Sequence, residues 1–310
     1  MRAFSNVTVG VEDLDIALSM WVDSFGLEVI DQSNGSDSGM SGLWNIGANE
    51  IRRQALVGTP GYETGRIHLV EFNDPDPPVR EAAQNFDACP KNLDLYVDDM
   101  AAQVERLTKL GYKFRNPQYS EITGSNGMRV REIHLSAHDQ TNVVLLEVQG
   151  EQFRFSPNGL CGIGPLITAV PEDDADIEKQ FYKSVIGLEN LHEERLTGES
   201  VEDMIGLPPG CGLEFSIWGH AEVPLGRIEI ITYVGVSGAN LFSRAKPKAL
   251  GILQVTFLTD DLSGLERRLA LSSTTFESHG RASTVGYTGD VISFTTPAGF
   301  RIVVVQNHEG

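Results

Sequence analysis

The strongest constraint in this sequence is an internal repeat. Gly26-Leu27-Glu28 recurs as Gly187-Leu188-Glu189, and Gly65-Arg66-Ile67 recurs as Gly226-Arg227-Ile228, both 161 positions later. The pairs Asp98-Asp99 and Asp260-Asp261 lie 162 positions apart. A repeat of half the 310-residue chain predicts two similar halves. We place a linker at 150–159, GEQFRFSPNG, and predict an N-terminal domain over 1–149 and a C-terminal domain over 160–310.

Each half divides again into two smaller units. Four short apolar-alternating runs are each followed by acidic residues and by a stretch with helical spacing. These runs begin near Ser5, Lys91, Gly164 and Ile252. Residues that favour helix starts and helix ends flank the helical stretches: Asp13, Asp99 and Asp261 at the starts, and Gly26, Gly111 and Gly187 at the ends. Strand-like runs follow each helix, so the sequence predicts four βαβββ modules.

This pattern resembles the vicinal oxygen chelate superfamily, the glyoxalase and bleomycin-resistance group, in a two-domain, four-module form. The segments that show this resemblance are NVTVGVEDL (Asn6–Leu14), NLDLYVDDM (Asn92–Met100) and QVTFLTDDL (Gln254–Leu262), with the FGLEV and IGLEN turns and the strands GRIHLVEF and GRIEIITY. The resemblance implies an α+β fold in which the four modules pair into two glyoxalase-like domains with cup-shaped mixed sheets. Function varies within such a fold and has to be argued from the site.

Composition narrows the partners. The formal net charge is −19, with 43 acidic against 24 basic residues and no basic cluster, which argues against binding to nucleic acid. No apolar run approaches the ~20 residues of a membrane span, so we expect no membrane partner and a cytoplasmic protein. The three cysteines lack paired spacing and predict free thiols. The expected partner is a small-molecule substrate, and association into a homodimer remains an alternative.

Strand alternation predicts which side chains face the cups. Val7, Val9 and Val11 form the helix-facing side of the first strand, which leaves Asn6 and Thr8 toward the cup. The same alternation turns further polar residues of the first half inward: His68, Asn92, Asp94, Tyr96, Glu132 and His134. So many polar groups on one wall favour a wet ligand pocket over a packed core. We predict His68 and Asp94 as catalytic residues, because an imidazole exchanges protons near neutral pH and a carboxylate can orient it. The predicted substrate-binding residues are Asn6, Thr8, Asn92, Tyr96, His134 and Glu147.

The resemblance also implies positions for metal ligands, which family members supply as His or Gln from the first strand of a module and Glu from its last. The first-strand positions hold Asn6, Asn92, Pro165 and Gln254. The last-strand positions hold His68, Leu145 or its neighbour Glu147, Glu229 and Val303. No cofactor is predicted from the residues alone; the weak candidates for a divalent metal (iron, manganese or zinc) are Glu229 and Gln254. A site made of His68, His134 and Glu147 is a second alternative.

Three functions follow as hypotheses. The first is an enzyme that moves a proton on a hydrophobic or aromatic oxygenated metabolite, of the isomerase or lyase type, without the usual metal triad. The others are a non-catalytic protein that sequesters a ligand and a metal-dependent ring-cleaving dioxygenase. The Gly- and Ser-rich stretch Ser33–Gly42 is interpreted as a lid or a spacer.

Overall fold

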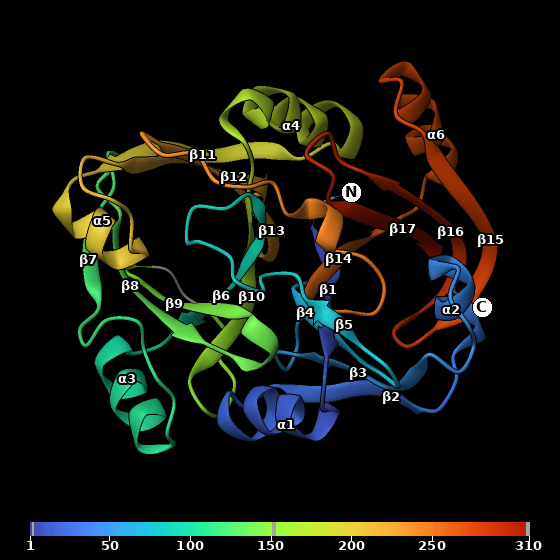
Figure 1. Ribbon diagram of the computed structural model, residues 1–310, viewed down its shortest axis with the longest axis horizontal. Coiled ribbons are helices and arrows are strands. Elements are labelled where there is room, and N and C mark those ends of the chain that lie inside the picture. Colours follow the sequence, from blue (N-terminus) through green and yellow to red (C-terminus); the bar gives the residue numbers. More distant parts are fainter. Residues whose placement is uncertain (2, 151–152, 308–310) are drawn as a thin grey trace.

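The computed structural model describes residues 1, 3–150 and 153–307, and it has the predicted α+β architecture of four βαβββ modules (Figure 1). Module 1 comprises β1 (Phe4–Val11), α1 (Leu14–Leu18), β2 (Glu28–Asn34), α2 (Ser38–Trp44), β3 (Ile51–Gly58) and β4 (Arg66–Phe72). After the short β5 (Asp76–Pro78), module 2 comprises β6 (Cys89–Val97), α3 (Met100–Lys109), β7 (Ser120–Thr123), β8 (Arg129–Ser136) and β9 (Asn142–Val148). Module 3 comprises β10 (Leu160–Ala169), α4 (Ala175–Phe181), β11 (Glu189–Thr197), α5 (Glu199–Ile205), β12 (Gly212–His220) and β13 (Val223–Val234). Module 4 comprises β14 (Ala249–Thr259), α6 (Leu262–Leu271), β15 (Phe276–Thr284), β16 (Tyr287–Thr295) and β17 (Arg301–Asn307).

The predicted helix starts are confirmed at the level of single hydrogen bonds. The carboxylates of Asp13, Asp99 and Asp261 each accept a backbone N–H from the first turn of α1, α3 and α6. Such a cap satisfies N–H groups that have no partner inside the helix. The three cysteines are buried free thiols, as predicted. None of the described helices is long and apolar enough to cross a membrane.

The strands form two sheets, and their order corrects one prediction. One sheet runs β15-β16-β17-β14-β1-β4-β3-β2, and the other runs β11-β12-β13-β10-β6-β9-β8-β7. The sheets are joined at their centres by antiparallel pairs, β1 with β14 and β6 with β10. Module 1 therefore shares a sheet with module 4, and module 2 with module 3; we name these the 1/4 sheet and the 2/3 sheet. The prediction that modules 1 and 2 form one cup and modules 3 and 4 the other is wrong, because each sheet takes strands from both halves of the chain.

The two modules within each half of the chain meet through their helices instead. Figure 1 shows α1 beside α3 at one end of the molecule and α4 beside α6 at the other. The Arg106 guanidinium donates to the Ser24 carbonyl at 2.8 Å across the first contact, and the Arg268 guanidinium donates to the Val185 carbonyl at 2.8 Å across the second. The largest apolar core draws buried side chains from all four modules. The four modules thus form a closed ring of alternating sheet and helix contacts.

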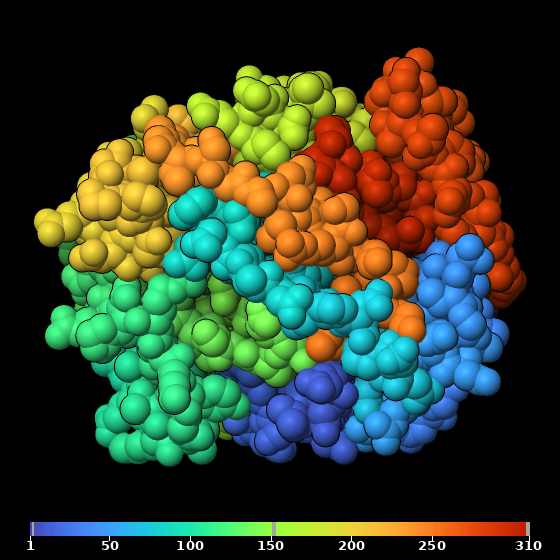
Figure 2. All heavy atoms as spheres, in the orientation of Figure 1, coloured from blue at the N-terminus to red at the C-terminus, as the bar shows by residue number. Residues whose placement is uncertain are grey.

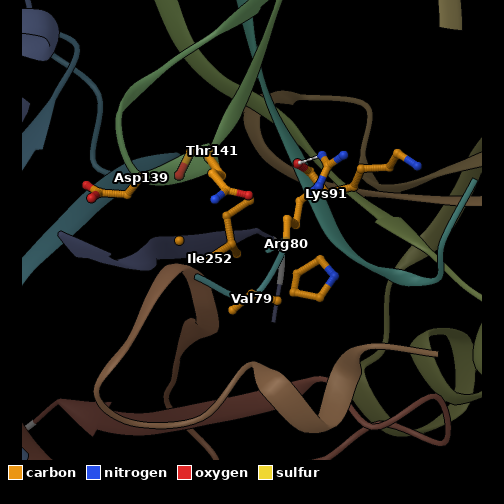
Figure 3. Close-up of a pocket in the computed structure, with 9 residues that line it drawn as sticks. Val79, Arg80, Lys91, Asp139, Thr141 and Ile252 are labelled. Atoms are coloured by element: carbon orange, nitrogen blue, oxygen red, sulfur yellow. Dashed lines mark hydrogen bonds between the residues drawn. The ribbon is translucent and has the colours of Figure 1, made fainter. Parts of the chain in front are cut away.

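Two connecting segments close one face of this ring. The Ala88 N–H donates to the Ala239 carbonyl at 2.9 Å, and the Leu241 N–H donates to the Ala88 carbonyl at 2.8 Å. In Figure 2 these segments, cyan and orange, cross the face side by side. A water-sized cavity of about 10 Å³ lies at this junction, lined by residues that include Val79, Arg80, Lys91, Thr141 and Ile252 (Figure 3). The crossing brings the start of β6 close to elements of both sheets.

The repeated Gly-Arg-Ile tripeptide stands where one sheet passes the other. Gly65 and Gly226 have φ of +67° and +84°. A Cβ added at Gly65 would lie 2.2 Å from the Ile163 carbonyl oxygen, and one added at Gly226 would lie 2.5 Å from the Phe4 carbonyl oxygen. Both conformation and space therefore require glycine, which gives the repeat a physical reason.

The cup of the 1/4 sheet is filled by its own chain. Helix α2 includes the end of the stretch that was predicted as a lid or a spacer. Its side chains Met40, Leu43 and Trp44 pack in a cluster with residues of β3, β4, β14, β16 and β17. Asp37 begins this helix by accepting the Met40 N–H at 2.9 Å. The stretch Ser33–Gly42 thus supplies part of a plug in the core.

His68 lies in this filled cup. It is 1% exposed, and its Nε2 lies 2.9 Å from the Gln54 Oε1, while the Gln54 amide donates to Asp37 at 2.9 Å. Burial lowers the pKa of His68 to about 4, and the nearby Asp37 and Asp31 carboxylates oppose that shift only in part. The neutral ring is therefore part of the packed structure, and it donates to Gln54 through Nε2–H.

His68 should make folding stability depend on pH. Because its folded-state pKa lies below the ordinary value, the unfolded chain binds more protons between about pH 6.5 and pH 4, so stability is lost as pH falls through this window. By pH 5 the loss due to this residue should be about 2 kcal/mol. When the pH is lowered from 7 to 5, we expect the free energy of unfolding, measured in urea, to fall by this amount more in the wild type than in His68→Gln. The same pH dependence in both proteins would contradict the assignment.

Gly226 should tolerate alanine less well than a glycine of the same backbone conformation. Gly187 also has φ +84°, but nothing lies within 4 Å of its added Cβ. Gly187→Ala should cost about 1–2 kcal/mol for the left-handed conformation. Gly226→Ala should cost about 1–3 kcal/mol more, because the Phe4 carbonyl has to move. Urea midpoints of the two variants measure the difference, and equal values would show that the contact between the sheets is soft.

Candidate functional site

The cup of the 2/3 sheet is open and holds a large cavity. Its volume is about 590 Å³, within the range of small-molecule sites. Its lining comes from β6, β8 and β9 of module 2 and from β10, β11, β12 and β13 of module 3, with α5 at one side. Much of the wall is apolar: Ile122, Leu146, Ile167, Met204, Leu213 and Phe215. This cavity is the candidate site.

The structure separates the predicted site residues into two groups. Asn92, Asp94, Tyr96 and His134 line the 2/3 cup, together with Glu132 and Glu229. Asn6, Thr8, His68 and Gln254 lie on β1, β4 and β14, in the other sheet. The prediction that His68 acts beside Asn92 and Asp94 in one cup is therefore wrong. The prediction failed because it paired module 1 with module 2. Strand alternation itself placed these side chains on the inner faces of their sheets.

Glu147 lies outside both cups. In the pairing of β8 with β9, Glu132 stands opposite Leu146 and Arg131 stands opposite Glu147. Leu146, one residue earlier, therefore faces the cavity, and the prediction of Glu147 as a substrate-binding residue is wrong. Its carboxylate instead accepts the Met100 N–H at 2.7 Å at the start of α3 and pairs with Arg131 at 3.2 Å.

Two carboxyl groups stand at the centre of the cup. Asp94 on β6 is 2% exposed, and its Oδ1 has no hydrogen-bond partner among the described residues. Glu229 on β13 lies deep in the protein but keeps part of its surface toward the cavity. Burial, and then the charge of Glu132, raise the pKa of Glu229 to about 8. Burial also raises the pKa of Asp94, with added repulsion from Glu229 and Glu132. At neutral pH Glu229 therefore holds a proton that an exposed carboxyl would have lost, and the pKa of Asp94 is shifted in the same direction.

His134 organises the wall beside them. Its Nε2 lies 2.7 Å from the Glu132 Oε1, and its Nδ1 lies 3.4 Å from the Arg115 Nη1. A guanidinium can only donate, so Nδ1 acts as acceptor and Nε2–H donates to Glu132. Both ring nitrogens are thus occupied, and His134 holds Glu132 and Arg115 in place.

Several lining residues were missed from the sequence, and the most informative is Lys91. It is the extra residue in the pairing of β6 with β10, where Pro90 pairs with Thr168 and Asn92 pairs with Ile167. This bulge lets Lys91 and Asn92, neighbours in sequence, both line the cup. Simple alternation would have turned Lys91 away, so the sequence carried no direct signal for it. Other cavity residues that were missed include Arg115, Arg227 and Tyr233.

The side chains at the positions where the family resemblance implies metal ligands do not form a metal site. Of the two candidate ligands, Glu229 lies in the 2/3 cup, while Gln254 lies in the 1/4 sheet, where its Oε1 accepts the Trp44 indole N–H at 2.8 Å. The alternative set of His68, His134 and Glu147 is likewise divided. Within residues 1, 3–150 and 153–307, no three His, Cys, Asp or Glu side chains come together as an ion site. The family position on β10 is Pro165, and the residue of β9 that faces the cavity is Leu146; neither side chain has a donor atom for a metal.

Comparison with known proteins finds likeness in structure. No protein-family model matches the sequence, and no curated protein matches it. Glyoxalase I from Zea mays superimposes with a TM-score of 0.68 at 15% identity, covering 99% of this chain and 93% of that one. A putative dioxygenase from Bacillus subtilis superimposes with a TM-score of 0.65 at 13% identity, covering 100% of this chain and 86% of that one. The chain has four βαβββ modules that curl into two cups, and it superimposes on these two structures over nearly its whole length. It therefore has the fold of the vicinal oxygen chelate superfamily.

Proposed function

We propose that the protein is an enzyme that moves a proton on a small oxygenated metabolite held in the 2/3 cup, in an isomerase or lyase type of reaction. The observation that carries this proposal is the pair of Asp94 and Glu229 on the wall of one cavity of metabolite size, where burial raises the pKa of both carboxyls. Perturbed carboxyls in a cleft are common features of acid–base sites.

The chemistry follows from the way the two groups interact. Two nearby buried carboxyls resist losing both protons, so a singly protonated pair has one carboxylate that can accept a proton and one carboxyl that can donate one. A C–H next to a carbonyl would give its proton to the carboxylate. The carboxyl would hydrogen-bond to the developing enolate oxygen, assisted by the Asn92 amide.

The apolar wall supports a hydrophobic or aromatic substrate. Ile167, Leu213 and Phe215 line the cavity, and Tyr96 stacks on Phe153 with ring centroids 3.9 Å apart. Such walls exclude water and strengthen the electrostatic interactions of the acid pair. Apolar walls also suit a protein that sequesters its ligand without chemistry. The following experiment distinguishes that function from catalysis.

Glu229→Gln should remove most of the proton transfer. The probe is 4-phenyl-2-butanone, a neutral ketone, and NMR follows exchange of its α-protons with deuterium oxide. We expect wild type to accelerate this exchange and Glu229→Gln to lower the acceleration about 100-fold, the usual contribution of a general acid or base. The control is Glu214→Gln on β12, whose neighbours Leu213 and Phe215 face the cavity while Glu214 itself does not line it. Saturable binding without exchange in the wild type would favour the sequestration protein.

The exchange rate should also depend on pH in a defined direction. Because the pKa of Glu229 is raised to about 8, its proton persists at neutral pH and is lost as pH rises through that value. Repulsion from the Glu229 carboxylate is among the causes that raise the pKa of Asp94, so Glu229 loses its proton first and the singly protonated pair forms as pH rises through about 8. We therefore expect the catalysed rate to rise through this window. A rate that stays flat or falls between about pH 7 and pH 9, after correction for hydroxide catalysis, would rule out Glu229 as the base.

A further inference from the structure

Three cationic side chains line the 2/3 cup without an ion-pair partner among the described residues, although the cup also holds acidic side chains and the chain has a net charge of −19. Lys91, Arg115 and Arg227 line the cavity. Within the described residues, none of the three forms an ion pair with a carboxylate. Buried cations are normally paired, so unpaired cations on a cavity wall indicate a ligand of opposite charge.

Lys91 and Arg115 lie at the same end of the cup. Lys91 is 3% exposed; its ammonium donates to the Asn85 carbonyl and lies 4.4 Å from the centroid of the Tyr233 ring. Figure 3 shows the Lys91 side chain directed away from the small junction cavity, while Arg80 donates to the Lys91 carbonyl. Burial lowers the pKa of Lys91 to about 7, and the charges of Arg80 and Arg115 add to that effect.

Asp87, the carboxylate that acts electrostatically on Lys91, is already occupied by backbone donors. Asp87 accepts the Ala239 N–H at 2.7 Å through Oδ1 and the Gln84 N–H at 2.7 Å through Oδ2. It anchors the crossing segments and makes no ion pair with Lys91. Lys91, Arg80 and Arg115 thus lie within electrostatic range of one another at this end of the cup, while Glu132, the acid close to Arg115, is hydrogen-bonded to His134.

Donors remain available beside Lys91. The Tyr233 hydroxyl is buried, belongs to a residue that lines the cavity, and has no hydrogen-bond partner among the described residues. Arg115 donates through Nη1 to the Ile205 carbonyl at 2.9 Å and to His134, and its remaining N–H groups donate to no described protein atom. A buried hydroxyl without a partner is costly, unless a ligand satisfies it.

We propose that Lys91, Arg115 and Tyr233 form a subsite for the carboxylate of the substrate, so that the cup takes a small hydrophobic or aromatic carboxylic acid. This inference rests on the proposed function for the assignment of the cup as a substrate site, and it adds the substrate class. The planar fork of Arg115 and the single hydroxyl of Tyr233 suit the two oxygens of a carboxylate. The apolar wall then holds the rest of the molecule, while Asp94 and Glu229 stand at its centre.

Binding of matched probes tests the subsite. The probes are 3-phenylpropionate, its neutral amide 3-phenylpropanamide, and 2-phenylethyl phosphate, measured by calorimetry at pH 7. We expect the carboxylate to bind wild type about tenfold more tightly than the amide. Lys91→Met and Tyr233→Phe should each weaken carboxylate binding about fivefold or more and leave amide binding within about twofold. Tyr233→Phe removes only an unpartnered hydroxyl, so it tests the subsite even if Lys91→Met fails to fold.

The control is Lys246→Met, which changes the net charge equally at an exposed residue paired with Asp76 at 3.8 Å. It should leave the affinities of all three probes unchanged. If Lys246→Met weakened carboxylate binding as much as Lys91→Met does, the effect of Lys91 would be one of overall charge and the subsite would be rejected. Equal binding of acid and amide to wild type, or wild-type affinity in Tyr233→Phe and Lys91→Met, would overturn the proposal. Tighter binding of the phosphate than of the carboxylate would overturn the carboxylate assignment. Because the exchange assay uses a neutral ketone, proton transfer and carboxylate binding can fail independently.

Discussion

The antiparallel pairing of β1 with β14 and of β6 with β10 determines which side chains can act together. Each pair joins the first strand of a module in one half of the chain to the first strand of a module in the other half, and so builds the floor of one cup from both halves. His68 and Asp94, 26 positions apart in sequence, fall into different cups, while Asp94 and Glu229, 135 positions apart, share one. Any argument about chemistry in this fold has to begin from that pairing.

The two cups show how one architecture can be used in opposite ways. In the 1/4 cup, α2 is anchored by Asp37, which accepts from Met40, Gln54 and Thr284, and its apolar side chains fill the space. In the 2/3 cup, the corresponding helix α5 begins after Gly198 without a side-chain cap. Its Met204 and Ile205 pack on strand residues of the 2/3 sheet and also line the cavity, which stays open. A single capping carboxylate with partners on β3 and β15 therefore distinguishes a helix that plugs its cup from one that borders it.

Much of this arrangement was predictable from sequence because it depends on local rules. Period-two alternation placed Asn92 and Asp94 on an inner face, the family resemblance pointed to Glu229, and the capping aspartates located three helices. Pairing between modules was not predictable, because the four first strands are similar and nothing local distinguishes their partners. Lys91 was missed because a bulge reverses the alternation at one residue, and Glu147 was misplaced because its strand position was taken one residue out of register. Local patterns thus predicted the fold and the facing of most strands, and long-range register decided the site.

The charges of the 2/3 cup are more easily explained by a ligand than by folding. If Glu229 or Asp94 paired with Lys91, the pKa of the carboxyl would fall, and burial would be offset by attraction. The structure keeps them apart: the carboxyls have raised pKa values, and Lys91 donates to a backbone carbonyl and contacts an aromatic ring. Separated buried charges weaken the folded state, so their presence on the wall of one cavity points to a role outside stability. A ligand with an anionic group at the Lys91 end and an oxygen near the acid pair would satisfy both ends at once, which orients it for proton transfer.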